Sequence, residues 1–252
     1  MEAAEVPLYL NWSFWAVIAA FIAVILSQIP PIKDLIKKAK LDLESYSKIS
    51  ITHKIGNPNL QLHLMLTNSG GRKVRIKDIY VHLTRDGGQL ITLPAQNYLQ
   101  NQNDQSSLLF TTFSLSPNQE WAHMTNFLNF FDRVDGKKYQ KIEGAMLSDY
   151  REQAKLVDEK EGHLIEHPEE LVSQAFDFFN SKFIWQSGEY TMRIEVKTVN
   201  DVANISKDYR FTIFETHTEQ MKATTEQYKL GGGIWWEPKS VQSGVILQIS
   251  EA

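Results

Sequence analysis

The stretch Leu60–Gly71, LQLHLMLTNSGG, decides the fold, because leucine occupies every second position before a turn sequence. Alternate side chains of an extended strand point to opposite faces, so this pattern predicts a half-buried antiparallel strand. Asn and Gly tolerate positive φ, so Asn68–Gly71 predicts a turn. Val74–Leu83 supplies the next strand, with a bulge at Lys77-Asp78 where the alternation shifts phase. The stretch therefore predicts the start of an antiparallel sheet.

Strand-like alternation returns on both sides of this stretch. Leu41–His53 precedes it, and Leu90–Leu93 follows a turn at Asp86–Gly88. Tyr190–Val196 and Tyr209–Ile213 alternate cleanly near the end of the chain and predict two paired strands. The inward-facing residues are expected to include Leu62, Leu64, Ile76, Ile79, Met192, Ile194 and Phe211.

Two blocks of the sequence resemble strands of immunoglobulin-like β-sandwich domains. The run Leu60–Gly71 with Val74–Val81 is similar to an early hairpin of those domains. Ser187–Ile194 is similar to their penultimate strand, which a Gly-x-Tyr sequence often opens. The chain lacks the two cysteines, and the core tryptophan between them, of the antibody type. The resemblance implies an antiparallel sandwich over residues 42–214 and implies no activity, since fold does not determine function.

The segment between the two blocks has helical periodicity. Its apolar residues fall three or four positions apart, at Trp121, Met124, Leu128 and Phe131. Ser116-Pro117 predicts a helix start and Asp135-Gly136 a helix end, and Pro168 opens a second amphipathic pattern. We expect a helical insertion at about 117–185, which either packs on the sandwich or forms a small subdomain.

The N-terminal region has the length and hydrophobicity of a membrane span. No charged residue occurs from Val6 to Ile32, and a bilayer core of about 30 Å requires roughly 20 such residues in a helix. Residues 10–30 therefore predict a transmembrane helix, with Trp12 and Trp15 in the interfacial aromatic belt. A cleaved signal peptide is the alternative, but such a peptide begins with basic residues, which are absent before the span.

Basic residues follow this predicted span and none precedes it. They are Lys33, Lys37, Lys38 and Lys40. The positive-inside rule then leaves residues 1–9 outside and places the C-terminal domain in the cytoplasm, at the cell membrane. The lysines of this basic juxtamembrane segment, 31–41, either hold it against anionic headgroups or only set the topology.

Small residues recur along one face of the predicted span, at Ala16, Ala20, Ala23 and Ser27. Membrane helices associate by close packing at such residues. This face predicts contact with a second copy or with a partner helix. The alternative is a helix that acts alone as an anchor.

The last part of the chain, 215–252, combines a polar helix, the glycines Gly231–Gly233 as a hinge, and a terminal strand or tail. Trp235 and Trp236 follow the hinge. Tryptophan is enriched at interface hot spots, so this pair is a candidate contact for a partner protein. The alternative is that the two side chains cover the core of the chain itself.

No catalytic residue, metal ligand or cofactor site is predicted. His163-Leu-Ile-Glu166-His167 matches the inverted zincin motif. However, Pro168 disfavours a helical conformation at the second histidine. The chain has no cysteine, and its net charge of −4 provides no basic field for nucleic acid.

The sequence therefore predicts a protein that is not an enzyme. The expected function is a membrane-anchored, cytoplasmic-facing binding or scaffold subunit that recruits or positions partner proteins. The alternative is a membrane-tethered ligand sensor that uses a pocket between sandwich and insertion. A deep polar pocket there would favour the sensor, and a broad apolar surface patch would favour the scaffold.

Overall fold

The computed structural model of this 252-residue chain describes residues 12–28, 38–101, 106–156, 164–199, 201–237 and 244–252. The strands in these ranges are β1 (Leu41–Lys54), β2 (Asn57–Asn68), β3 (Val74–Arg85), β4 (Gly88–Leu99), β5 (Leu108–Leu109), β6 (Phe113–Leu115), β7 (Glu120–Leu128), β8 (Gly188–Thr198), β9 (Ile205–Ile213), β10 (Gly244–Gln248) and β11 (Ser250–Glu251). The helices are α1 (Trp12–Gln28), α3 (Arg133–Ala154), α4 (Glu169–Lys182), α5 (Glu215–Lys222) and the 3₁₀ helix η2 (Ala223–Leu230).

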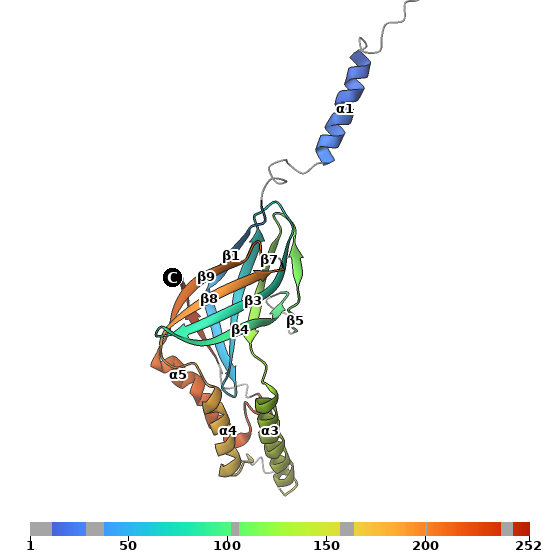
Figure 1. Ribbon diagram of the computed structural model, residues 1–252. Coiled ribbons are helices and arrows are strands. Elements are labelled where there is room, and N and C mark those ends of the chain that lie inside the picture. The colour runs from blue at the N-terminus through green and yellow to red at the C-terminus, as the bar shows by residue number, and fades with distance from the viewer. Residues whose placement is uncertain (1–11, 29–37, 102–105, 157–163, 200, 238–243) are drawn as a thin grey trace, which may run out of the picture.

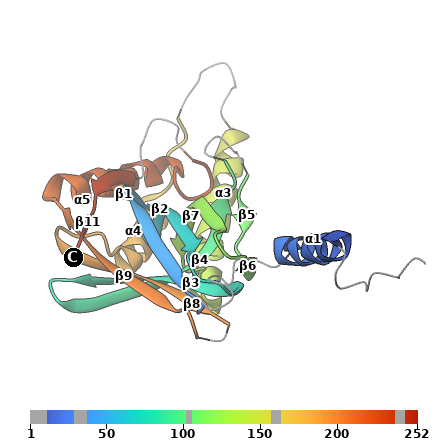
Figure 2. The same ribbon diagram turned by 90° about the horizontal axis from the view of Figure 1, so that it is seen from above.

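Within these ranges, the strands form one antiparallel sheet in the order β10-β1-β2-β7-β4-β3-β8-β9-β11, with β5 beside β4 and β6 beside β3. The strand β4 joins the part of the sheet that contains β3 to the part that contains β7. Its first residues pair with β3, and its last residues pair with β7. At the other end, β10 pairs with β1, and β11 pairs with β9. The sheet therefore curves into a near-closed barrel (Figures 1 and 2).

The predicted antiparallel, mainly β domain is confirmed, but the immunoglobulin-like resemblance is wrong. An immunoglobulin-like domain has two separate sheets that pack face to face. Here β4 carries the hydrogen-bonded ladder from one wall to the other, with a register shift between Ala95 and Asn97. Period-two alternation shows only that one face of a strand is buried. That condition is the same in a sandwich and in a barrel-like sheet.

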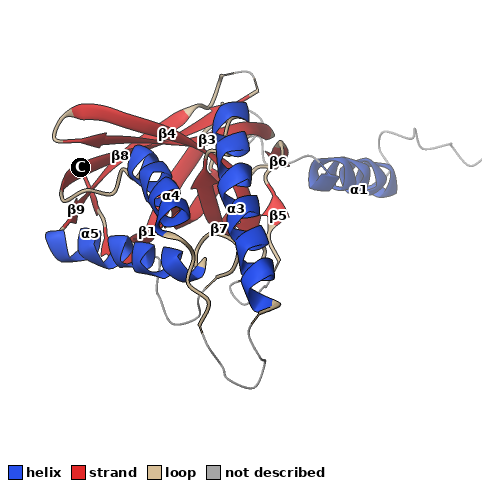
Figure 3. Ribbon diagram, turned by 90° about the horizontal axis from the view of Figure 1, so that it is seen from below, coloured by secondary structure: helices blue, strands red, loops and turns tan. Residues whose placement is uncertain are grey.

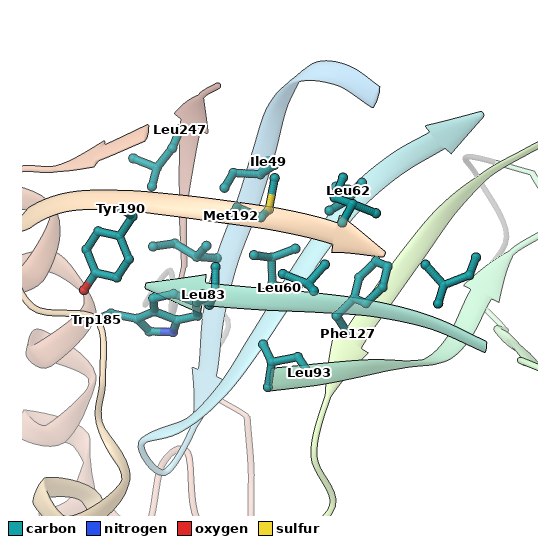
Figure 4. Packing of buried hydrophobic residues seen from close by; sticks show 14 of the residues in the cluster. Ile49, Leu60, Leu62, Leu83, Leu93, Phe127, Trp185, Tyr190, Met192 and Leu247 are labelled. Atoms are coloured by element: carbon teal, nitrogen blue, oxygen red, sulfur yellow. The ribbon is translucent and has the colours of Figure 1, made fainter. Parts of the chain in front are cut away.

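The interior of the sheet contains the residues that the alternation predicts. All seven predicted inward residues are at most 3% exposed. Figure 4 shows side chains of β2, β3 and β7 turned into one shared interior, among them Leu60, Leu83 and Phe127. The indole of Trp185 is fully buried there and donates to the carbonyl oxygen of Thr52 at 2.8 Å.

Two local predictions for β3 are confirmed. The register between β3 and β8 shifts between Ile76 and Asp78, which is the predicted bulge. The hairpin from β3 to β4 turns at Asp86 and Gly87, both with positive φ. Positive φ at both central residues is the geometry that follows the twist of a two-residue hairpin.

The predicted helix from Pro117 is wrong, because Glu120–Leu128 forms β7, between β2 and β4. Its inward positions include Thr125, which is fully buried, and His123. Polar residues on the buried face concealed the period-two pattern, and the remaining apolar residues happened to match helical spacing.

In the described chain, α3 and α4 lie between β7 and β8 and cover the lower end of the barrel together with α5 (Figures 1 and 3). The side chain of Asp132 caps α3 by accepting from the N–H groups of Val134 and Asp135. The prediction that Asp135-Gly136 ends a helix is therefore wrong, because this pair lies in the first turn of α3. Pro168 precedes α4, as its position in the sequence indicated.

No helix in the described part of the chain is long and apolar enough to cross a membrane. The predicted single-span anchor over residues 10–30 is therefore not supported. The orientation and membrane location depended on that span and stay predictions.

Candidate functional site

The described residues of the predicted span lie apart from the barrel. In Figure 1, α1 stands away from the β domain, at the end opposite the other helices. Trp12 and Trp15 are exposed, and so is the small-residue face Ala16, Ala20, Ala23 and Ser27. Lys38 and Lys40 are exposed beside the first strand, whereas Lys33 and Lys37 lie outside the described residues. Association through this helix stays a prediction.

The tryptophan pair is split between two environments. Trp235 packs on the aromatic ring of Tyr150, with ring centres 4.8 Å apart, and on the buried core. Trp236 is 38% exposed, and its indole donates to the carbonyl oxygen of Leu230 at 2.9 Å. The glycines before them form turns with positive φ at Gly231 and Gly233. A partner contact at the pair stays a prediction, with Trp236 the more accessible member.

The motif that ends in His167 has a structural role at its described end. The Nδ1 atom of His167 lies 2.7 Å from Oδ2 of Asp149, and its Nε2 atom accepts from the Trp235 indole at 3.4 Å. Both ring nitrogens therefore have protein partners, and the imidazole joins α3 to the C-terminal segment. His163 lies outside the described residues. Within the described ranges, no group of His, Asp or Glu side chains is arranged to hold a metal ion.

A polar array on the outer face of the sheet is the arrangement closest to catalytic chemistry. His82 Nδ1 lies 2.8 Å from the Thr92 hydroxyl, and its Nε2 lies 3.0 Å from a carboxylate oxygen of Glu195. A hydroxyl, an imidazole and a carboxylate in this order also form nucleophilic triads. However, these residues lie on the adjoining strands β4, β3 and β8, whose backbone groups pair with one another. Hydrogen bonds between His82 and side chains on both neighbouring strands form a cross-strand polar ladder.

The candidate functional site is an open seam in the barrel wall, between β9 and β10. A hollow of about 520 Å³ lies there. Its lining includes inward-facing side chains of both strands, Phe211 and Leu247, together with outward-facing Arg210 and Gln248. Side chains from both faces of both strands line the hollow. The hollow therefore lies between the edge of β9 and the edge of β10.

The backbone of β10 directs hydrogen-bonding groups into this seam. The N–H of Ile249 donates to the carbonyl oxygen of Ser47 at 2.8 Å, so this residue pairs toward β1. Hydrogen-bonded residues alternate in an antiparallel pair. Val245 and Leu247 therefore also pair toward β1, whereas Ile246 and Gln248 direct their N–H and C=O groups to the opposite side.

The backbone of β9 borders the seam from the other side. Ala252 donates to the carbonyl oxygen of Asp208 at 3.0 Å, and Arg210 lies opposite Ser250 in β11. By the same alternation, Thr212 directs its backbone groups into the seam, beyond the end of β11. In the described part of the chain, no strand pairs with this end of β9 or with the outer edge of β10.

Apolar side chains flank the open edges. Ile246 is 70% exposed and Phe214 is 57% exposed, and both line the hollow. Charged and polar groups also line the hollow: Arg210 is one of them, and the Thr212 hydroxyl donates to Glu189 at 2.9 Å. Among the described residues, the seam thus combines backbone groups that no strand pairs with and an apolar contact surface.

Sequence reasoning missed the seam, although one signal was present. In the run Val245-Ile246-Leu247, the middle residue interrupts the alternation with a large apolar side chain on the outward face. An outward isoleucine on a terminal strand is a sign of contact with something beyond the sheet. The absence of a strand beside it could not be read from the sequence.

No protein-family model matches this chain, and no curated protein has a similar sequence.

Proposed function

We propose that this protein is a binding subunit that holds an extended segment of a partner protein in the seam, by strand pairing along β10. The observation that carries the proposal is the outward edge of Ile246 and Gln248, whose backbone groups have no partner strand in the described chain. An exposed strand edge takes up an extended peptide through backbone hydrogen bonds.

The side chains beside this edge supply the remainder of the interaction. Alternate residues of a bound strand would meet the apolar surface of Ile246 and Phe214. Burying such side chains contributes roughly 25 cal/mol for each Å² of apolar surface removed from water. The polar groups at Arg210 and Glu189 would then select among segments by charge.

Site-specific photocrosslinking tests the proposal. A photoreactive amino acid at Gln248, introduced into the full-length protein in its own host cells, should yield one discrete crosslinked partner chain. Ile246→Pro removes an N–H that faces the seam and leaves the pairing with β1 intact, since proline is tolerated where the N–H faces away from the sheet. The crosslinked yield should fall roughly fivefold, in line with about 1 kcal/mol for one backbone hydrogen bond.

A matched control separates the seam from general surface hydrophobicity. Val134, in the first turn of α3, is also 70% exposed, and Val134→Ala should leave the crosslinked yield unchanged. Equal yields from Ile246→Pro and the original protein would contradict strand pairing. A crosslinked dimer of this chain, with no other partner, would contradict the recruitment of another protein.

A further inference from the structure

A second hollow, of about 410 Å³, lies between the β1–β2 hairpin, the end of β7 and α3. This volume falls within the range of small-molecule sites, roughly 300–1,000 Å³. Its walls are mostly apolar, with Pro58, Leu128, Phe130 and Phe131 among the lining residues. Phe130 is 70% exposed at its edge. An exposed aromatic ring beside an apolar hollow favours an apolar body as the occupant.

The charge that lines the hollow is positive. Lys54 is the charged lining residue, and the lining includes no Asp or Glu. Its ammonium group lies 5.3 Å from the centre of the Tyr139 ring, and it forms no ion pair within the described chain. An unpaired ammonium at the edge of an apolar hollow favours an anionic group on the occupant.

The imidazole of His53, in the wall, adds no charge to the hollow. Its Nδ1 accepts from the N–H of Gly56 at 3.2 Å, so Nε2 carries the proton and donates to the carbonyl oxygen of Met221 at 3.0 Å. Burial lowers the pKa of His53 below its usual 6.5, and the bond to Met221 only partly opposes this shift. The ring is therefore neutral near pH 7, and Lys54 determines the sign of the charge.

One buried polar atom in the wall around the hollow has no hydrogen-bond partner in the described chain. The Oδ1 atom of Asn59 is buried and has no hydrogen bond in the described chain. The neighbouring amides are already used, because Asn57 donates to the Asn129 carbonyl and Asn129 donates to the Thr92 carbonyl. This acceptor is costly to bury, but it is enclosed by the protein and so is not a contact for a ligand.

We infer that this hollow binds a small carboxylate with an apolar, preferably aromatic, body. The carboxylate lies against Lys54, and the body packs on Phe130 and Phe131. This site is separate from the seam, since the two hollows share no lining residue. The inference goes beyond the proposed strand pairing, and its test does not depend on whether strand pairing occurs.

Calorimetric titration of the full-length protein with a matched pair of probes tests the inference. 3-Phenylpropanoate carries the anionic group, and 3-phenylpropanamide has the same body without the charge. The carboxylate should bind about fivefold more tightly than the amide, which is the effect of one accessible ion pair worth about 1 kcal/mol. Lys54→Met keeps most of the side-chain stem and should abolish this fivefold preference. Phe130→Ala should weaken both probes.

Lys48→Met is the control, because Lys48 is an exposed lysine on the same strand that does not line the hollow. It should retain the preference for the carboxylate. Circular dichroism and thermal unfolding establish that each variant is folded. Equal binding of the two probes to the original protein, or an unchanged preference in Lys54→Met, would overturn the inference. Absence of binding by both probes at millimolar concentration would also overturn it.

Discussion

The hydroxyl of Tyr139, on α3, donates to the carbonyl oxygen of Ile234 at 2.6 Å, across 95 residues of sequence. The bond is buried, and burial raises the pKa of Tyr139, so the hydroxyl remains a donor over the accessible pH range. Ile234 belongs to the turn that carries the tryptophan pair. This contact therefore ties the helical end of the barrel to the segment that leads toward β10.

Removing this hydroxyl should loosen that segment. Tyr139→Phe leaves the Ile234 carbonyl without its donor, so the free energy of unfolding should fall by roughly 1–3 kcal/mol. Denaturant unfolding measures this change, and amide exchange should accelerate over residues 231–236. Tyr46→Phe is the control, since Tyr46 is 58% exposed, and its effect should stay within about 0.5 kcal/mol. Equal effects of the two substitutions would show that the buried bond contributes nothing.

Two glycines with similar backbone angles should respond differently to alanine. Gly56 has a φ of +85°, and a Cβ there would lie 2.4 Å from the Phe179 carbonyl oxygen. Gly87 has a φ of +81°, and a Cβ there would meet no atom within 4 Å. Gly87→Ala should lower the free energy of unfolding by about 1 kcal/mol, because alanine is strained in the left-handed conformation. Gly56→Ala should cost at least about 2 kcal/mol more, because α4 must shift. Similar denaturation midpoints for the two variants would show that α4 does not contact the hairpin as described.

The stability of the domain should depend on pH through His53. Burial lowers the pKa of this imidazole in the folded state, so below about pH 6.5 the unfolded chain binds the extra proton first. The contribution of the neutral, buried imidazole to the free energy of unfolding is complete above pH 6.5 and is lost as the pH falls below that value. Denaturant unfolding at pH 7 and pH 5 should show the loss. Titration of the ring proton by NMR supplies the second measurement, and a midpoint at or above 6.5 would rule out this origin.

Amide exchange should reveal the open edge directly. In the free protein, the N–H groups of Val245 and Leu247 should exchange slowly, because they pair with β1. Those of Ile246 and Gln248 should exchange faster, since they face the seam. NMR-detected exchange resolves the individual residues. Uniform protection along 245–248 would mean that the seam is closed.

The alternation of apolar residues along the strands, clearest in the leucines of β2, determines much of the fold. It correctly predicted the antiparallel pairing, the seven buried residues and the bulge near Lys77, because each depends on local pattern and on burial of one strand face. It failed at β7, where Thr125 occupies a buried position and disguises the period. It also suggested an immunoglobulin-like sandwich, since alternation does not specify which strands become neighbours.

The sequence by itself thus determined most of the long strands, most of the core and the absence of a disulfide framework. The tertiary structure decided that β4 joins the two walls, that the C-terminal segment nearly closes the barrel, and that a seam remains beside Ile246. It also brought Lys54, Asn59 and Phe130 around one hollow. The physical reason is that the pattern of apolar residues along a single strand is enough to show which face of that strand is buried. Strand order and the gaps between elements depend instead on contacts between residues far apart in sequence.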